Sequence, residues 1–204
     1  MALRVDHAVV SGTFSLDGET HDVDNNVWVV GDDEECVVID APHDVDAILR
    51  VVAGRQVKAI LLTHAHDDHC RVAPALREAT SAPVLLHPDD KPLWELTHTD
   101  WLWDADLEDG LSIKVAGASV KVLHTPGHAP GAVCFYVHDL GAVFTGDTLF
   151  QGGPGATGRS FSDEDVIEAS IREKLFALPD ETVVHTGHGD DTTIGAEREA
   201  LGDA

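Results

Sequence analysis

Short apolar runs alternate along the chain with stretches in which apolar side chains recur every three or four residues. The runs predict strands at residues 27–30, 36–39, 58–62, 83–86, 113–115, 120–123, 133–137, 142–144 and 182–184. The longer periodicity predicts helices at residues 44–54, 68–79 and 162–178. Ser162 is expected to cap the last helix and Pro179 to end it. Because strands and helices are mixed throughout, the pattern predicts an α/β layered fold with helices outside the sheets.

Two segments follow neither pattern. Residues 94–103 hold three of the four tryptophans, which are expected to pack in the core or in a lid. Residues 151–159 form a glycine-rich loop without periodicity. The length predicts a single domain over residues 1–204, and no apolar run approaches the roughly 20 residues that a membrane span needs.

The chain is strongly acidic, with a formal net charge of −24, and 43% of its residues are hydrophobic. The hydrophobic content supports a packed core and excludes disorder. The charge repels phosphate backbones and anionic lipid, so we expect neither nucleic acid nor a membrane as a partner. No apolar leader opens the chain, and the three widely spaced cysteines are odd in number, so reduced thiols and a cytoplasmic location are expected. The sequence leaves open whether the chain forms a homodimer.

Residues 63–69, which follow the predicted strand at 58–62, read Thr-His-Ala-His-Asp-Asp-His. The imidazole and carboxylate groups of this segment suit zinc, iron or manganese. Residues two apart in an extended segment point the same way, so His64 and His66 can hold one ion. Asp68 and His69 lie past the bend, where the next helix is predicted, and can face a second ion.

Three more candidate ligands follow predicted strands in the same way, namely His128, Asp147 and His188. A glycine precedes each of them, which permits the tight turn and close approach that a crowded site needs. Ligands gathered beyond strand ends match the general rule for sites in α/β proteins. Each loop alone is a weak indication, but together they predict a metal centre.

The segment 63–69 and the pairs Gly127-His128, Gly146-Asp147 and Gly187-His188, in this order, closely resemble the metallo-β-lactamase superfamily. The resemblance covers nearly the whole chain. It implies an αβ/βα four-layer sandwich of two similar halves, with two mixed sheets and helices outside. It also implies a site for two divalent metal ions at one edge, with zinc favoured and iron or manganese as alternatives.

The resemblance also implies a role for each residue of that site. The residues implied to bind the first ion are His64, His66 and His128. Those implied to bind the second ion are Asp68, His69 and His188. Asp147 would bridge the two ions, and Asp40 would orient the ligand loop from behind the ligands.

Within the superfamily, residues 146–150 and Gly158-Arg159 resemble the hydroxyacylglutathione hydrolase (glyoxalase II) branch. This implies hydrolysis of a small-molecule thioester, with Arg159 either meeting an anionic group of the substrate or forming a surface salt bridge. Long members of that branch carry a C-terminal helical region that helps to hold glutathione, and the residues after His188 are too few for it. The thiol therefore stays open between glutathione, another low-molecular-weight thiol such as mycothiol, and CoA.

The expected mechanism is attack of a metal-bound hydroxide on the thioester carbonyl. Two divalent ions ~3.5–4 Å apart lower the pKa of a bridging water toward neutrality. Asp68 is the expected catalytic residue, since it can orient the hydroxide or accept its proton. A thioester suits this site because a thiolate, whose thiol has a pKa of ~8.5, leaves without a proton donor.

The same motifs leave other functions open. The alternative reaction is that of a persulfide dioxygenase, for which the resemblance implies a single iron held by His64, His128 and Asp147. A metal-dependent sensor or inactive scaffold is a third hypothesis, which the intact ligand set disfavours. Lactamase action is disfavoured because no export signal is found, and nuclease action because of the charge of −24.

Overall fold

The computed structural model describes residues 2–202, and two six-stranded sheets form its centre. The first sheet has the strand order β1 (Arg4–Leu16), β2 (Glu19–Gly31), β3 (Glu35–Ile39), β4 (Gln56–Leu61), β5 (Val84–Leu86) and β6 (Ala105–Asp106). The second has the order β14 (Thr192–Thr193), β13 (Val183–Thr186), β10 (Ala142–Gly146), β9 (Val133–Val137), β8 (Ala118–His124) and β7 (Ser112–Val115). Strands β11 (Leu149–Phe150) and β12 (Gly153–Pro154) pair separately. Both large sheets mix parallel and antiparallel neighbours.

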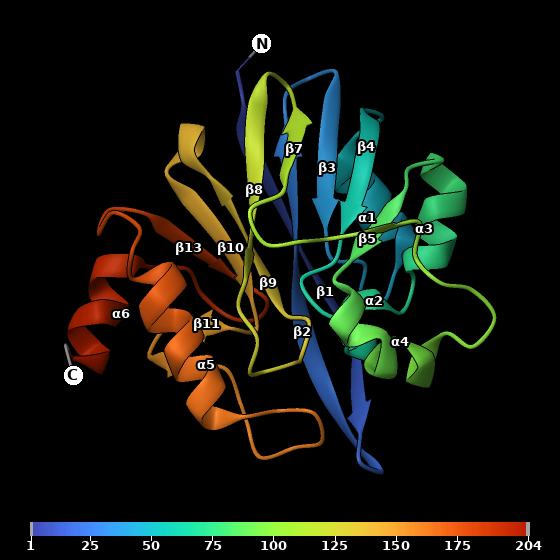
Figure 1. Ribbon diagram of the computed structural model, residues 1–204. Helices are drawn as coiled ribbons and strands as arrows, with labels where there is room; N and C mark the ends of the chain where they lie inside the picture. The colour runs from blue at the N-terminus through green and yellow to red at the C-terminus, as the bar shows by residue number, and fades with distance from the viewer. Residues whose placement is uncertain (1, 203–204) are drawn as a thin grey trace.

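The helices lie on the outer faces of the two sheets (Figure 1). The first sheet is covered by α1 (Val45–Val52), α2 (Asp67–Cys70), α3 (Ala73–Thr80), the short turn η1 (Pro88–Asp90) and α4 (Lys91–Thr97). The second sheet is covered by α5 (Glu164–Ser170), the π-helical turn η3 (Ile171–Leu175) and α6 (Ile194–Leu201). The turn η2 (His138–Leu140) joins β9 to β10. Within residues 2–202, no helix combines the length and the apolar character that crossing a bilayer requires.

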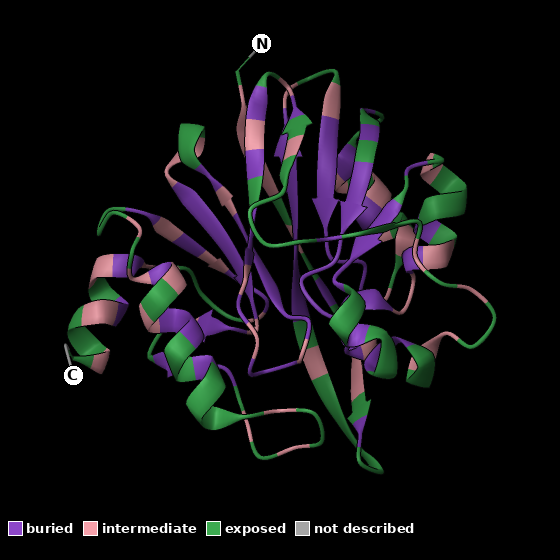
Figure 2. Cartoon of the chain, in the orientation of Figure 1, coloured by how far each residue is buried: buried purple, intermediate pink, exposed green. Residues whose placement is uncertain are grey.

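Strand β3 shows how the layers are held together. Successive side chains of a strand point to opposite faces. Val37 and Ile39 therefore pack between the two sheets, where Phe135 from the second sheet also lies. Cys36 and Val38 point the other way, into the core beneath the helices. Both faces of the strand are buried, which is why the run is apolar throughout, as the central strands of Figure 2 show. The four layers confirm the predicted sandwich with helices outside.

The helix predicted at residues 68–79 is two helices, α2 and α3. Pro74 lies in the first turn of α3 and has no N–H to donate to the carbonyl of Cys70, four residues earlier. The Cys70 carbonyl instead accepts a hydrogen bond from Nε2 of His98 at 3.0 Å. The break turns the chain directly after the histidine-rich segment.

The helix predicted at residues 162–178 begins later and changes character midway. Its N-cap is Asp163, whose side chain accepts a hydrogen bond from the Val166 N–H, so the prediction of Ser162 was wrong. The Ser162 hydroxyl is engaged elsewhere, because it donates to the carbonyl of Arg159. After Ser170 the chain continues as the turn η3, which ends at Leu175.

The sequence patterns missed most of the β1–β2 hairpin. Only residues 27–30 were predicted as a strand, whereas β1 and β2 pair over their full lengths. The hairpin turns at Asp17-Gly18, both with positive φ, and Asp-Gly is a strong hairpin signal that could have revealed it. Its far half extends beyond the other strands at the bottom of Figure 1. This extension reaches past the end of the sandwich where the predicted ligands lie.

Candidate metal centre

Four loops meet at one end of the sandwich, each after a strand. One follows β4 of the first sheet and carries residues 64–69, while the others follow β8, β10 and β13 of the second sheet. The latter three carry His128, Asp147 and His188. The two sheets face each other, so ligand loops distant in sequence come together, and all seven side chains fall into groups that could hold a metal ion.

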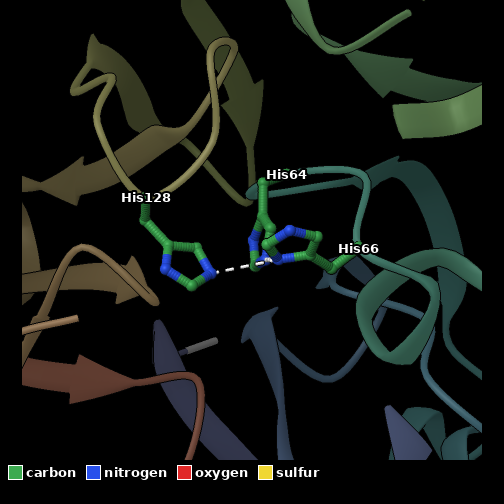
Figure 3. A group of neighbouring side chains, drawn as sticks. All are labelled: His64, His66 and His128. Carbon is green, nitrogen blue, oxygen red and sulfur yellow. Dashed lines mark hydrogen bonds between the residues drawn. The ribbon is translucent and has the colours of Figure 1, made fainter. Parts of the chain in front are cut away.

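The first group joins three imidazoles from two loops, as Figure 3 shows. Nδ1 of His66 lies 2.9 Å from Nε2 of His64 and 3.0 Å from Nε2 of His128. The His128 Nδ1 lies 2.8 Å from the Ala156 carbonyl, to which it must donate, so a neutral His128 presents a lone pair at Nε2. Ring nitrogens of the three histidines therefore converge on one position, where a cation would fit.

The second group consists of Asp68, His69 and His188. Nε2 of His69 lies 3.2 Å from Nε2 of His188 and 3.6 Å from Oδ2 of Asp68. Oδ2 of Asp68 lies 3.3 Å from Nε2 of His188. One carboxylate and two imidazoles thus converge as the ligands of a divalent transition metal do.

Asp147 lies between the two groups. Oδ2 of Asp147 lies 3.5 Å from Nε2 of His128 and 3.4 Å from Nε2 of His188. Oδ1 lies 3.3 Å from Nε2 of His69. Gly187 packs directly against this carboxylate, because a Cβ at that position would lie 2.3 Å from Oδ1 of Asp147. A glycine is therefore needed there for close approach.

Most of the converging imidazoles are held from behind through their other nitrogen. The Nδ1 of His69 lies 2.8 Å from Oδ2 of Asp40, and the Nδ1 of His188 lies 2.7 Å from the Asp24 carbonyl. The Nδ1 of His64 lies 3.1 Å from the hydroxyl of Thr63, which can donate to Asp40. Such contacts set the tautomer and orientation of a metal-binding histidine.

The charges of the two groups differ. Burial lowers the pKa of His66 to about 3 and holds that of His64 well below its usual range, so both rings are neutral. Burial also opposes charge on His188, but Asp147 and Asp68 together outweigh it and raise the pKa of His188 to about 10. Burial raises the pKa of Asp68, but the charge of His69 and the hydrogen bonds from His188 and Asn25 together outweigh it and leave the value at about 2. The carboxylates of Asp68 and Asp147 thus attract positive charge.

The donor set fits divalent metal ions. Oδ1 of Asp147 is buried and accepts no hydrogen bond from residues 2–202, its polar neighbour being Nε2 of His69 at 3.3 Å. A buried carboxylate oxygen without a partner is costly, and a cation beside it would offset that cost. Neutral imidazoles and ionised carboxylates are the ligands that such ions take in proteins.

A cavity of about 380 Å³ opens over both groups. Its walls include Phe14 and Val23 from the β1–β2 hairpin and Arg159 from the glycine-rich loop. The guanidinium carbon of Arg159 lies 5.1 Å from the centroid of the Phe14 ring. The neighbouring Ser160 donates a hydrogen bond from its backbone N–H to the carboxylate of Asp17 at the hairpin tip. Arg159 is therefore at the wall of the cavity rather than among the converging ligand atoms.

Sequence reasoning missed Asn25, which lies on β2 beside the second group. Its Nδ2 donates to Oδ2 of Asp68 at 3.0 Å, and its Oδ1 lies 2.8 Å from Nε2 of His43. No local pattern marks Asn25, since its role depends on the pairing of β1 with β2. The three clustered tryptophans do not line the cavity. Trp94 is fully buried and donates to the carbonyl of Trp101.

A further histidine cluster, away from this centre, has a different geometry. The rings of His87 and His124 stack with centroids 4.0 Å apart and an interplanar angle of 11°. Asp89 completes the cluster. The lone pairs of imidazole lie in the ring plane, so two nearly parallel rings do not direct them at one point. We therefore assign no metal to these three residues.

Residues 22–188 match the family model of the metallo-beta-lactamase superfamily. Probable metallo-hydrolase YqgX of Bacillus subtilis is 33% identical over 196 residues, which cover 85% of this chain and 89% of that protein. Hydroxyacylglutathione hydrolase GloC of Haemophilus influenzae is 33% identical over 189 residues, which cover 85% of this chain and 89% of that protein.

Two solved structures share this architecture. The crystal structure of the BLEG-1 B3 metallo-beta-lactamase has a TM-score of 0.80 at 32% identity, and covers 93% of this chain and 97% of its own. The crystal structure of TTHA1623 in a di-iron-bound form has a TM-score of 0.77 at 37% identity, and covers 87% of this chain and 94% of its own. The fold and the resemblance predicted from the sequence are thereby confirmed.

Proposed function

The chain belongs to the metallo-beta-lactamase superfamily, and from this premise we propose that it is a metal-dependent hydrolase cleaving a thioester of a low-molecular-weight thiol. The observation that carries the proposal is the position of Asp147, whose oxygens lie 3.3–3.5 Å from ring nitrogens of both ligand groups. A carboxylate placed in this way can bridge two cations beneath a cavity. The similarity to hydroxyacylglutathione hydrolase GloC supports the thioester as substrate.

Each of the two ligand groups is proposed to hold one cation. The residues proposed for the first cation are His64, His66 and His128. Those proposed for the second are Asp68, His69 and His188. Asp147 is proposed to bridge them, and Asp40 to hold His69 in the required orientation.

Divalent cations in this place would supply an activated water and polarise the carbonyl of the substrate. A thioester needs no further proton donor, because a thiol of pKa ~8.5 leaves readily as the thiolate. Of the acids that line the cavity, only Asp24 lies outside the proposed ligand set. Asp24 already accepts a hydrogen bond from the hydroxyl of Ser11. The residues around the cavity therefore suit a leaving group that departs unprotonated.

Asp68 is proposed to accept the proton of the attacking water. It lines the cavity and belongs to the group proposed to hold the second cation, so its carboxylate lies close to where a cation-bound water would be. The hydrogen bond from Asn25 holds Oδ2 of Asp68 in place.

Arg159 is proposed to bind an anionic group of the substrate. Its side chain contacts the Phe14 ring and lies 3.5 Å from Nε2 of His21. Neither contact neutralises the guanidinium charge, which can therefore attract a carboxylate entering the cavity. The apolar ring of Phe14 can cover the hydrocarbon part of the acyl group or thiol.

Zinc is the proposed metal, with iron or manganese as alternatives. The di-iron form of TTHA1623 supports iron as an occupant of a centre of this kind. The proposed partner is a small-molecule thioester in the cytoplasm, and the net charge of −24 argues against nucleic acid and membranes. Whether the chain forms a homodimer bears on none of these roles.

Opening of a β-lactam is the second candidate, since BLEG-1 is 32% identical and is described as a B3 metallo-beta-lactamase. The nitrogen that leaves a β-lactam must gain a proton, whereas a thiolate leaves without one. Of the acids that line the cavity, Asp24 alone lies outside the proposed ligand set, so the cavity offers little besides the ligands to supply that proton. This favours the thioester over the lactam.

The test combines elemental analysis with a substrate panel. Zinc-loaded protein is assayed with thioesters of glutathione, mycothiol and CoA, with a β-lactam, and with a thiol persulfide in an oxygen electrode. We expect about two ions per chain and hydrolysis of at least one thioester. Replacing His66 by alanine should abolish turnover, whereas replacing the exposed His138 should not.

Each other result has a definite meaning. Faster turnover of the β-lactam than of every thioester would make the protein a lactamase. One iron per chain with oxygen uptake would make it a persulfide dioxygenase. A filled centre without any turnover would favour the sensor or scaffold hypothesis.

A further inference from the structure

Asp90 is a fully buried carboxylate that takes no part in the proposed ligand groups. It ends the turn η1 and precedes α4, on the helical side of the first sheet. Burial raises its pKa to about 7, against the lowering effect of two backbone hydrogen bonds. A buried carboxylate is expensive to keep in a protein. Its two hydrogen bonds indicate what it does.

The two oxygens of Asp90 bind one N–H from each half of the sandwich. Oδ2 accepts from the backbone N–H of Ala65 at 2.8 Å, and Oδ1 accepts from that of Gly131 at 2.5 Å. Ala65 stands between His64 and His66, in the loop after β4. Gly131 lies three residues after His128, in the loop between β8 and β9.

All three histidines of the first group therefore lie on the two loops that Asp90 connects. One other backbone contact joins the same loops, from the Val133 N–H to the Thr63 carbonyl at 2.8 Å. That contact lies outside both the 64–66 segment and His128, whereas Asp90 binds within the first and close to the second. Asp90 thus links the loop that carries His66 to the loop that carries His128.

The site admits only a carboxylate with this geometry. Asparagine has the same shape but presents an NH₂ group to one of the two N–H donors, so one hydrogen bond is lost. The other side of the contact is equally tight, because a Cβ on Gly131 would lie 2.7 Å from the backbone nitrogen of Asp90 and 2.9 Å from its Oδ1. Alanine at residue 131 would therefore displace Asp90, backbone and carboxylate together, from its position.

We propose that Asp90 is a positioning residue that holds His64 and His66 at the correct distance from His128, and so sets the affinity of the first cation site. The inference rests on the proposed cation site but not on any substrate. Asp68 and His69 of the second group follow Ala65 on the same segment, but they are held by contacts of their own with Asn25 and Asp40. The affinity of the second site should therefore depend on Asp90 much less than that of the first.

The test measures metal affinity rather than activity. Metal-free wild type, Asp90→Asn, Gly131→Ala and the control Asp89→Asn, an exposed neighbour, are titrated with Zn²⁺ against a competing chelator at pH 8. Outer partners of metal ligands are worth about 10–100-fold in affinity. We expect a loss of this size at one of two sites in Asp90→Asn and Gly131→Ala, with the other site within about 2-fold and Asp89→Asn unchanged. The absorption spectrum of the Co²⁺-loaded variants should change with it.

Two results would overturn the inference. Wild-type affinity at both sites in folded Asp90→Asn and Gly131→Ala would show that Asp90 does not position the ligands. Failure of both variants to fold would show that its role is structural. If the wild type binds fewer than two ions, the ligand assignment of the proposed function is wrong, and the inference about Asp90 is wrong with it. If the wild type binds two ions and the variants bind them with unchanged affinity, only the inference about Asp90 is wrong.

Discussion

Asp40 accepts a hydrogen bond from His69, with 2.8 Å between Oδ2 and Nδ1. The same carboxylate accepts from the Thr63 N–H and hydroxyl, each at 2.8 Å, so it connects the end of β3 to the histidine-rich segment. Asp40 itself has a φ of +65°, a conformation that aspartate and asparagine adopt more readily than most residues. One buried carboxylate thus orients both the loop and an imidazole of the second group.

The first prediction concerns this contact. Asp40→Asn preserves the shape and the backbone conformation but leaves an NH₂ group facing one of the donors that Asp40 accepts from. We expect metal affinity to fall by about 10–100-fold, measured by chelator competition, while the far-ultraviolet circular dichroism stays unchanged. Asp139→Asn, at an exposed position on η2, is the control. Unchanged affinity would remove the role assigned to Asp40.

The second prediction separates the two cation sites. Asp147→Ala should lose both ions, because Asp147 contacts histidines of both groups, whereas His66→Ala should lose mainly the first. Turnover should fall by at least ~100-fold in both variants, because loss of a ligand should cost more than the roughly 10–100-fold expected when a residue that only contacts a ligand is replaced. Elemental analysis of the purified variants gives the stoichiometry. Full activity in either variant would contradict the mechanism.

The third prediction concerns substrate binding. Arg159→Ala should raise the KM for a carboxylate-bearing thioester by about 10-fold or more, the worth of one charge-assisted hydrogen bond of 1.5–3 kcal/mol. The kcat should change little, since Arg159 is not among the ligands. Arg159→Lys should recover part of the loss. A thioester without a carboxylate serves as the control substrate, and an equal loss for it would refute the role.

The fourth prediction tests the helical layer with two leucines. Leu76 on α3 is fully buried, and Leu96 on α4 is 63% exposed. Leu76→Ala should lower the free energy of unfolding by about 2–5 kcal/mol because it leaves a cavity. Leu96→Ala should change it by no more than about 0.5 kcal/mol. Urea denaturation of the metal-free proteins compares them, and similar values for the two variants would contradict the packing described.

The fifth prediction concerns pH. The pKa of Asp90 is about 7 in the folded chain, against an ordinary value of 3.8. Between these values the folded protein keeps a proton that the unfolded chain releases. The contribution of Asp90 to stability is therefore present below about pH 4 and is lost as the pH rises to 7, by up to about 1.4 kcal/mol per pH unit.

Asp90→Asn isolates this contribution, because asparagine does not titrate. Unfolding free energies of the metal-free wild type and of Asp90→Asn are compared from pH 4 to 8. The wild type should lose stability relative to the variant across the lower part of that range and run parallel to it above pH 7. Parallel curves throughout would mean that the pKa of Asp90 is not raised.

Local sequence patterns predicted much of this structure. The four-residue run 36–39 identified a strand buried on both faces, and β3 covers it. The segment 63–69 identified candidate ligands, because the donor atoms are specified by residue type and their direction by the short spacing. The structure places Asp40 and Arg159 beside this centre, although their roles stay predictions.

Other features were beyond such patterns. The end of α2 depends on Pro74, and also on a long-range hydrogen bond that the Cys70 carbonyl accepts from Nε2 of His98. Asn25 reaches Asp68 only because the β1–β2 hairpin brings distant residues beside the ligand loop. Asp90 lies among charged and apolar neighbours whose sequence gives no indication of a contact with Ala65 and Gly131.

The amino-acid sequence alone determined which chemical groups are present, which strands and helices are favoured, and the family to which the chain belongs. These depend on residue type and on spacings of a few residues. Tertiary structure alone decided which groups meet: that Asp147 faces both sets of imidazoles, and that a buried carboxylate joins the two halves. Those contacts arise from the packing of one sheet on the other, which is the sum of many weak interactions between residues far apart in the chain.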